Sequence, residues 1–334
     1  MSKIIITDSS LRDGNHAVKH KIDLDSIDRY SKFAEAAGIP ILEVGHGNGL
    51  GASSLLIGQS PFPDEVMLAT AKQNLSNTKL GIHIIPGITT IKKDVERILD
   101  VVDVYRVATH CTEATLAKSH IEYLKNKDKK VFGVLMMSAL ADTDTLVKNA
   151  KVMEEYGADA VIIMDSTGTY LPGEVMERIW ELKEYLGIDV GFHAHDNLGL
   201  ATANSLIAAQ AGAKYIDGCI RGFGAGAGNA HLEMIIPVLK KAGFEIDIDF
   251  KRVIIEADKV MDYLVPTAPI STPVNVLTGL NRLFSGFEKP IIKASKLFGI
   301  EYSSLIFELG NRKLVAGQED LILEAAQKLK KWEY

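Results

Sequence analysis

Cysteine is scarce in this sequence. The 334 residues contain two, Cys111 and Cys219, which lie far apart and form no Cys-x-x-Cys pair. Two isolated cysteines argue against a disulfide framework and are typical of a protein of the reducing cytoplasm, which is where we expect this one. Each adjoins an apolar segment, so we expect buried, unreactive thiols rather than nucleophiles.

Long apolar runs and an excess of basic residues are also missing. No apolar run approaches the roughly 20 residues that span a bilayer, and the N-terminus enters an apolar strand pattern without a signal-peptide pattern. The net charge of −6 offers no basic surface for nucleic acid or for anionic lipid. We therefore expect neither nucleic acid nor a membrane among the partners.

Short apolar runs rich in β-formers are abundant, and helical patterns alternate with them. The eight candidate strands are residues 3–8, 39–46, 80–86, 102–109, 131–137, 159–166, 189–195 and 214–220. Near-continuous apolar strands separated by helices predict a parallel sheet that is covered on both faces. Eight such units in roughly 240 residues predict an α/β fold of the (β/α)8 TIM-barrel type, with a doubly wound open sheet as the alternative.

The pattern changes to helices alone after about residue 245. One of these helical stretches covers residues 275–287, and the segment 265–273 before it carries three prolines, as a connection between two units would. The sequence therefore predicts a TIM-barrel catalytic domain over residues 1–264. Residues 265–334 are predicted to form a C-terminal helical subdomain that serves as a lid or a partner interface.

Charged and imidazole side chains crowd the ends of two predicted strands. The first strand runs toward LRDGNH (11–16) and the seventh ends in HAH (193–195). On a strand, His193 and His195 project from one face and Val190, Phe192 and Ala194 from the opposite face, which should face the helices, so both imidazoles should face the barrel interior. The carboxyl ends of barrel strands form one mouth. Charged groups gathered there must be paired or must bind something.

Asp13, His193 and His195 form a candidate metal site. Two imidazoles and one carboxylate make a mixed nitrogen and oxygen set that leaves coordination positions open for substrate. Such a set suits a catalytic ion, with Mn²⁺ first and Mg²⁺, Fe²⁺, Co²⁺ and Zn²⁺ as further candidates, better than a closed structural site. Arg12 is placed either to pair with Asp13 or to stabilise an oxyanion. The glycine-rich loop 222–229 is expected to approach a ligand through its backbone.

Longer motifs run along essentially the whole chain. They include LRDGNHAVKH, EVGHGNGLGASS, RVATHCTEA, MDSTG, HAHDNLGLATANS, GAGAGNAHLE and VAGQEDLI. In these runs the sequence resembles the 4-hydroxy-2-oxovalerate aldolases, metal-dependent pyruvate aldolases of the barrel superfamily that also holds hydroxymethylglutaryl-CoA lyase. Runs such as ATHCTEA and AGQED are much more specific than His-x-His.

This resemblance implies a role for each residue at the two strand ends. Asp13, His193 and His195 would be the metal ligands. Arg12 would stabilise the transition state, and His16 would be the general base.

The resemblance also implies a substrate and its contacts. The substrate would be a 4-hydroxy-2-oxoacid such as 4-hydroxy-2-oxopentanoate, held by Arg12, Asp13, Ser166 and His193. Removal of the C4 hydroxyl proton would break the C3–C4 bond, release an aldehyde and leave the enolate of pyruvate. The physiological setting implied is the catabolism of aromatic hydrocarbons.

Three positions depart from the family pattern. Phe284 stands where those aldolases have a substrate-contacting tyrosine, and it has no hydroxyl to donate a hydrogen bond. His83, which shares a strand face with Ile85, stands where the family has a leucine-rich aldehyde pocket, so we expect His83 to contact the aldehyde end of the substrate. Because a histidine titrates near pH 6.5, His83 is expected to act there as a donor or proton carrier. Asp196 replaces a third histidine, as in the CoA-dependent relatives.

The overall expectation is a class II aldolase, a metal-dependent carbon–carbon lyase. Two alternatives stay open, namely a Claisen-type synthase or lyase acting on an acyl-CoA, and a metal-binding subunit without turnover of its own. The resemblance also implies an aldehyde dehydrogenase as partner, consistent with the C-terminal VAGQEDLI. A homo- or hetero-oligomer is therefore expected.

Overall fold

Eight parallel strands close into a barrel in the computed structural model, which describes residues 2–312, 314 and 317–330. The strands are β1 (Ile5–Leu11), β2 (Ile41–Val44), β3 (Lys79–Ile84), β4 (Val104–His110), β5 (Lys130–Met136), β6 (Ala160–Asp165), β7 (Asp189–Ala194) and β8 (Tyr215–Gly218). Each strand pairs with its neighbour in the chain, and β1 closes the ring on β8 through pairs such as Ile6 with Ile216. The TIM-barrel prediction is confirmed, and the open-sheet alternative is wrong.

Helices surround the barrel. They are α1 (Leu24–Ala37), α2 (Asp64–Lys72), α3 (Lys118–Lys125), α4 (Thr143–Glu155), α5 (Pro172–Tyr185), α6 (Ala201–Gln210), α7 (Leu232–Lys241) and α8 (Phe250–Lys259). Helix α1 shows why they begin and end where they do, since the Asp23 side chain caps its first turn and Gly38 ends it with a φ of 74°. Between β3 and β4 the crossover holds two short turns, η2 (Ile91–Val95) and η3 (Glu96–Ile98), in place of an α-helix.

The apolar side chains form two cores, one on each face of the barrel wall. The larger core lies between the strands and the helices, and it includes Val190, Phe192 and Ala194 of β7. The smaller core fills the barrel with side chains such as Phe132 and Tyr215. The helix-facing position predicted for Val190, Phe192 and Ala194 is thus confirmed. Both cysteines are buried, as expected, and burial raises the pKa of each thiol.

The strand ends differ slightly from the sequence prediction. Strand β1 continues to Leu11 rather than ending at residue 8, so Arg12 and the 3₁₀ turn η1 (Asp13–His16) follow the strand directly. Strand β7 ends at Ala194, and His195 beyond it forms an isolated bridge with Asn229. No helix in the described part of the chain is long and apolar enough to cross a membrane.

The C-terminal region is helical and has a core of its own. It contains α9 (Pro273–Leu280), the 3₁₀ turn η8 (Ser285–Phe287), α10 (Glu288–Phe298), α11 (Tyr302–Gly310) and α12 (Asp320–Lys330). The helix expected over 275–287 ends at Leu280, because Arg282 has a φ of 54°, which a helix cannot accommodate. The division at residues 264 and 265 stays a prediction. Residues 331–334, and Val315 and Ala316 of the VAGQEDLI motif, lie outside the described residues.

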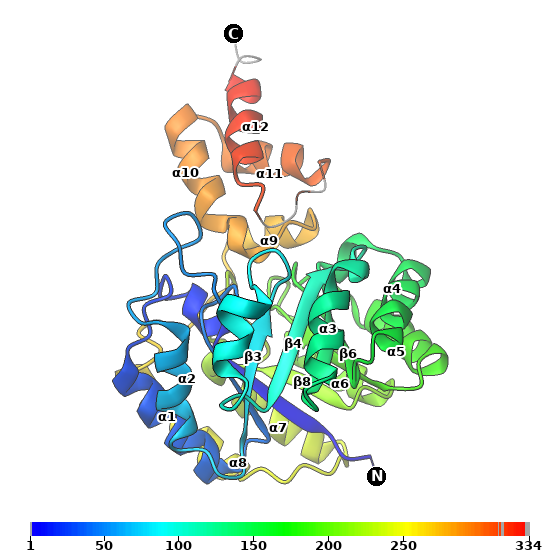
Figure 1. Ribbon diagram of the computed structural model, residues 1–334. Coiled ribbons are helices and arrows are strands. Elements are labelled where there is room, and N and C mark those ends of the chain that lie inside the picture. Colours follow the sequence, from blue (N-terminus) through cyan, green and yellow to red (C-terminus); the bar gives the residue numbers. More distant parts are fainter. Residues whose placement is uncertain (1, 313, 315–316, 331–334) are drawn as a thin grey trace.

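The C-terminal helices cover one end of the barrel. In Figure 1 the arrows of β3 and β4 point toward α9, so these helices lie at the carboxyl ends of the strands. Helix α9 is fastened there by Asn197, which donates to the carbonyl of Asn275 (3.1 Å) and accepts from the Ser271 hydroxyl (2.8 Å). A Cβ on Gly279 would come within 3.0 Å of the Asn197 Cβ and 3.4 Å of the Thr167 carbonyl. The helix therefore rests directly on the loops after β6 and β7.

Gly191 on β7 gives a test of how tightly the barrel wall is packed below the mouth. A Cβ there would meet the Ile162 side chain at 2.3 Å and the Tyr215 backbone oxygen at 2.9 Å, so Gly191→Ala must push strands apart. We expect the free energy of unfolding in urea to fall by roughly 1–3 kcal/mol, as overpacked cores show. The control is Gly173→Ala in α5, where nothing lies within 4 Å and no loss is expected. Equal stability of the two variants would contradict this packing.

Candidate active site

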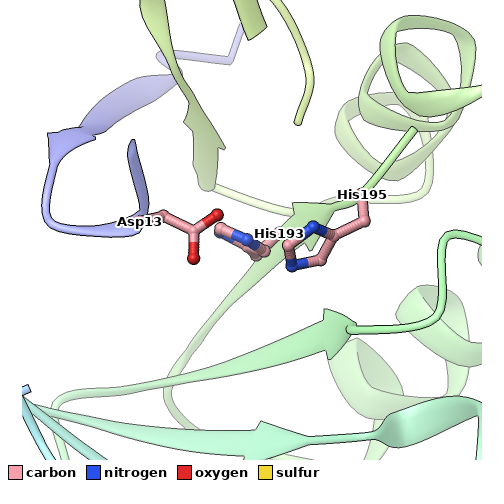
Figure 2. A group of neighbouring side chains, drawn as sticks. All are labelled: Asp13, His193 and His195. Carbon is pink, nitrogen blue, oxygen red and sulfur yellow. The ribbon is translucent and has the colours of Figure 1, made fainter. Parts of the chain in front are cut away.

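Asp13, His193 and His195 meet at the mouth of the barrel. One ligand atom from each lies within 4.8 Å of the others, and all three residues are buried. Figure 2 shows the carboxylate of Asp13 reaching toward the two imidazoles, which come from the end of β7. The structure thus brings together the three residues that the sequence proposed as a metal site.

The surroundings of Asp13 keep it ionised. Its Oδ1 accepts a hydrogen bond from Arg12 Nη1 (2.7 Å), and its Oδ2 accepts from the Asn229 amide (2.6 Å) and from the Ala225 N–H (3.4 Å). Burial alone would raise the pKa of Asp13, but the positive charges of Arg12 and the neighbouring imidazoles hold the pKa far below its usual value. Asp13 is therefore an anion at any pH at which the protein works.

Both histidines keep a nitrogen available for a cation. Among the residues that the structure describes, His193 Nε2 and His195 Nδ1 are buried and have no hydrogen-bond partner. His193 Nδ1 lies 2.9 Å from Asp217 Oδ2. Burial lowers the pKa of His195 to about 4, so this imidazole is neutral at pH 7. Two buried imidazole nitrogens without hydrogen-bond partners among the described residues, beside an ionised carboxylate, fit a divalent metal ion.

Arg12 holds its guanidinium at the same point. Nε donates to Glu43 Oε2 (2.9 Å) and Nη1 to Asp13, while the buried Nη2 has no partner among the described residues. Burial lowers the pKa of Arg12, but Glu43 and Asp13 outweigh that effect and raise it above the usual value. Arg12 therefore forms ion pairs with Asp13 and Glu43 and still has one donor, Nη2, for an anionic ligand.

His16 ends the turn that begins with Asp13, and its ring packs against Gly47. A Cβ on Gly47 would lie 2.7 Å from the ring, so only glycine leaves room for the imidazole there. Burial lowers the pKa of His16 to about 4, against the raising effect of Asp13. The imidazole is therefore unprotonated at neutral pH, which is the state a general base requires.

A cavity of about 220 Å³ opens over this group. Its lining includes the five strand-end residues together with Ser166, His83, Ile85 and Phe284. The Ser166 hydroxyl accepts from the Met137 N–H (2.9 Å), and the Phe284 ring comes from the C-terminal region. This volume is below the roughly 300–1,000 Å³ of drug-sized ligand pockets, so the cavity suits a smaller molecule. The side chains proposed from the sequence as ligands, catalytic groups and substrate contacts therefore meet around one cavity, whereas the loop 222–229, also expected to approach a ligand, does not line it.

His83 faces the mouth from β3 but differs electrostatically from the expectation. Its Nδ1 lies 3.5 Å from Glu43 Oε1. Burial and the positive charge of Arg12 lower the pKa of His83 to about 4, although Glu43 opposes them. The ring is thus neutral near pH 7. It retains one N–H to donate, and, like His16, it does not titrate near neutrality as its ordinary pKa suggested.

Four polar residues at the site were not singled out from the sequence, namely Glu43, Arg106, Asp217 and Asn229. Within the observed strands β2, β4 and β8, the single Asp, Glu, Lys or Arg residue is Glu43, Arg106 and Asp217 respectively, and all three face the barrel interior fully buried. That isolation was the available signal, since an ionised group inside an apolar run must have a partner. Asn229 is the last residue of the glycine-rich loop 222–229. Its side-chain amide and the backbone N–H of Ala225 in the same loop both donate to Asp13 Oδ2.

Asp196, the departure that suggested CoA chemistry, lies outside the cavity lining. Its Oδ1 accepts from the Ala201 N–H (2.9 Å), at the start of α6, and its own N–H donates to the Gly228 carbonyl. In this structure Asp196 organises two loops rather than the mouth.

Comparisons with known proteins match this architecture along the whole chain. A family model described as HMGL-like matches residues 3–260, and one described as a DmpG-like communication domain matches residues 269–331. A 4-hydroxy-2-oxovalerate aldolase of Spirochaeta aurantia is 52% identical over 328 residues, 98% of this chain and 96% of that protein. One of Pectobacterium atrosepticum is 47% identical over 330 residues, with the same coverage. The chain belongs to the HMGL-like family, among the 4-hydroxy-2-oxovalerate aldolases.

Solved structures share the fold of this chain. The carboxyl transferase domain of Rhizobium etli pyruvate carboxylase superposes with a TM-score of 0.81 at 14% identity, covering 98% of this chain and 60% of that one. At that identity the likeness concerns the fold alone.

Proposed function

We propose that this protein is a divalent-metal aldolase that cleaves 4-hydroxy-2-oxovalerate, also named 4-hydroxy-2-oxopentanoate, to pyruvate and an aldehyde. The observation that carries the proposal is the convergence of three groups on one small cavity. These are the carboxylate and two imidazoles, the donor-bearing Arg12 and the neutral His16. Family membership supports it, because the relatives described above carry that activity in their names.

Asp13, His193 and His195 would hold the metal, with Mn²⁺ expected first and Mg²⁺, Co²⁺ and Zn²⁺ also suited to the donor set. The bound metal would supply Lewis-acid polarisation of the 2-oxo group. Ser166 lines the same cavity, which supports its proposed role as a substrate contact.

The remaining chemistry falls to His16 and Arg12. His16 takes the proton from the C4 hydroxyl, the C3–C4 bond breaks, and its electron pair remains on the pyruvate fragment as an enolate. Arg12 Nη2, the donor without a partner, stabilises the negative charge on that enolate. The aldehyde leaves, a proton from solvent water at C3 then completes pyruvate, and His16 returns its proton to solvent.

The cavity favours this reaction over the acyl-CoA alternative. Arg12 is the one Lys or Arg side chain among the described residues that line it, and Glu43 and Asp13 already pair with it. The CoA phosphates would therefore find no free cation there.

We also infer that the C-terminal region, residues 269–331, contacts a partner protein, an aldehyde dehydrogenase. Its match to a communication domain supports this, as do exposed apolar side chains on its helices, among them Leu297 (66% exposed) and Phe307 (55%). Phe284 of the same region lines the cavity from which the aldehyde would leave.

The function is tested by supplying the Mn²⁺-bound protein with 4-hydroxy-2-oxoacids of varied C4 substituent and following pyruvate release. Consumption of acetyl-CoA is assayed in parallel. Pyruvate release without acyl-CoA turnover is the expected result. Acyl-CoA turnover alone would favour the synthase, and no turnover in either assay would favour a subunit that works only with a partner.

The metal ligands are tested by binding rather than by activity. We expect His193→Ala and His195→Ala to lose stoichiometric Mn²⁺ binding in calorimetry, and Asp13→Asn to weaken it, because each removes a donor. The matched control is His120→Ala in α3, a buried histidine that bonds the Thr89 carbonyl away from the mouth. Tight Mn²⁺ binding by the His193/His195 double variant would rule out this ligand set.

The proposed roles of Arg12 and His16 can be distinguished by two assays. Arg12→Lys keeps the charge that Asp13 and Glu43 need but loses the forked donors, so we expect metal binding to persist and kcat to fall about 10²–10³-fold. His16→Ala should lose cleavage while retaining exchange of the pyruvate methyl protons, followed by NMR, because that exchange does not involve the C4 hydroxyl. Cleavage by His16→Ala at the wild-type rate would show that His16 is not the base.

His83 and Phe284 should determine which aldehyde is preferred, because both line the cavity. Of the two, only His83 can donate a hydrogen bond. We expect His83→Leu combined with Phe284→Tyr to shift kcat/KM toward acetaldehyde over glycolaldehyde by at least about tenfold in the condensation direction. Each single variant serves as the other's control. An unchanged preference in all three variants would leave His83 as a packing residue.

A further inference from the structure

The metal ligand His193 is held from behind by a buried carboxylate on the neighbouring strand. Asp217 of β8 is 1% exposed, and its Oδ2 lies 2.9 Å from His193 Nδ1. The same oxygen is paired with the guanidinium of Arg106, and a carboxylate held by an arginine acts as a hydrogen-bond acceptor. His193 Nδ1 must then carry the proton, which leaves the lone pair on Nε2.

Arg106 of β4 reaches the same carboxylate from across the barrel. Its Nη2 donates to Asp217 Oδ2, the oxygen that His193 also uses. Its Nε lies 3.6 Å from Oε1 of Glu43, and Oε2 of the same carboxylate accepts a hydrogen bond from Arg12. Arg106 is 0% exposed and lies below the cavity, outside its lining. It therefore fixes Asp217 without contact with a ligand in the cavity.

We propose that Asp217 and Arg106 are positioning residues, which hold the His193 imidazole in the tautomer and orientation that presents Nε2 to the metal. The inference rests on the proposed metal site, with His193 as a ligand. A hydrogen-bonded carboxylate behind a metal-binding histidine fixes the ring and raises its basicity, and loss of such a partner weakens metal binding about 10–100-fold. Because Arg106 also touches Glu43, the same contacts link His193 to the guanidinium of Arg12.

The first test uses the wild-type chain without metal. Histidine-labelled ¹⁵N protein, with the His193 signals assigned through His193→Gln, should show the proton on Nδ1 of His193. A proton on Nε2 would overturn the proposal whatever any variant does.

The second test titrates metal-stripped Asp217→Asn with Mn²⁺ alone, followed by the electron paramagnetic resonance signal of free Mn²⁺. We expect the dissociation constant to rise about 10–100-fold and the His193 signals to show a mixture of tautomers. The double variant Arg106→Gln/Asp217→Asn removes the pair without changing the net charge, and it should show the same loss. The double variant replaces the single variant in this test if Asp217→Asn does not fold because Arg106 has lost its counterion.

The control is Asp8→Asn. Asp8 is a buried carboxylate of β1 that accepts from Ser10 and Tyr30 and touches no proposed ligand, so Mn²⁺ affinity should be unchanged. Wild-type affinity in a folded Asp217→Asn variant, or equal loss in Asp8→Asn, would refute the positioning role. None of these measurements needs turnover, so a wild-type protein that released no pyruvate would reject the proposed reaction and leave this inference in place.

Discussion

A chain of alternating charges crosses the barrel interior just below its mouth, in the order Asp217, Arg106, Glu43, Arg12, Asp13. Each group is at most 4% exposed, and each lies within 3.6 Å of the next. Removing one partner from such a buried pair costs about 3–5 kcal/mol, because the charge that remains has neither water nor a counterion. Strands β2, β4 and β8, which carry no proposed catalytic residue, therefore determine the site as firmly as β1 and β7 do.

The net charge of these five buried groups also determines which ligands the mouth of the barrel can bind. Three carboxylates stand against two guanidiniums, and burial lowers the pKa values of His16, His83 and His195 to about 4, so these imidazoles add no charge near pH 7. One negative charge is left in excess. A divalent cation reverses that excess, and a monoanionic acid then makes the whole neutral. The same groups that make the barrel interior polar thus favour a metal together with a small monocarboxylate.

The fold could be predicted from the sequence because eight apolar runs separated by helical patterns allow few other architectures. The two strand-end motifs could be predicted to meet, since parallel strands bring their carboxyl ends to one mouth. The pairing of Arg12 with Asp13 could be predicted as one possibility, but its second partner, Glu43, could not, because Glu43 lies 31 residues away and the contact depends on barrel register. For the same reason, the ordinary pKa of histidine misled for His83, whose titration depends on burial among residues from three other strands. Local sequence determines which side chain faces inward, but not which charge it meets there.

The C-terminal region completes the mouth through packing rather than charge. Gly279 of α9 sits against Asn197, two residues beyond His195, and against the carbonyl of Thr167, next to Ser166. Phe284, shortly after that helix, lines the cavity itself. The part of the chain that matches a communication domain therefore touches the loops of a proposed metal ligand and of a proposed substrate contact. Since even a Cβ on Gly279 would come within 3.0 Å of the Asn197 Cβ, α9 is closely packed on these loops, and a shift of α9 toward the barrel should move them with it.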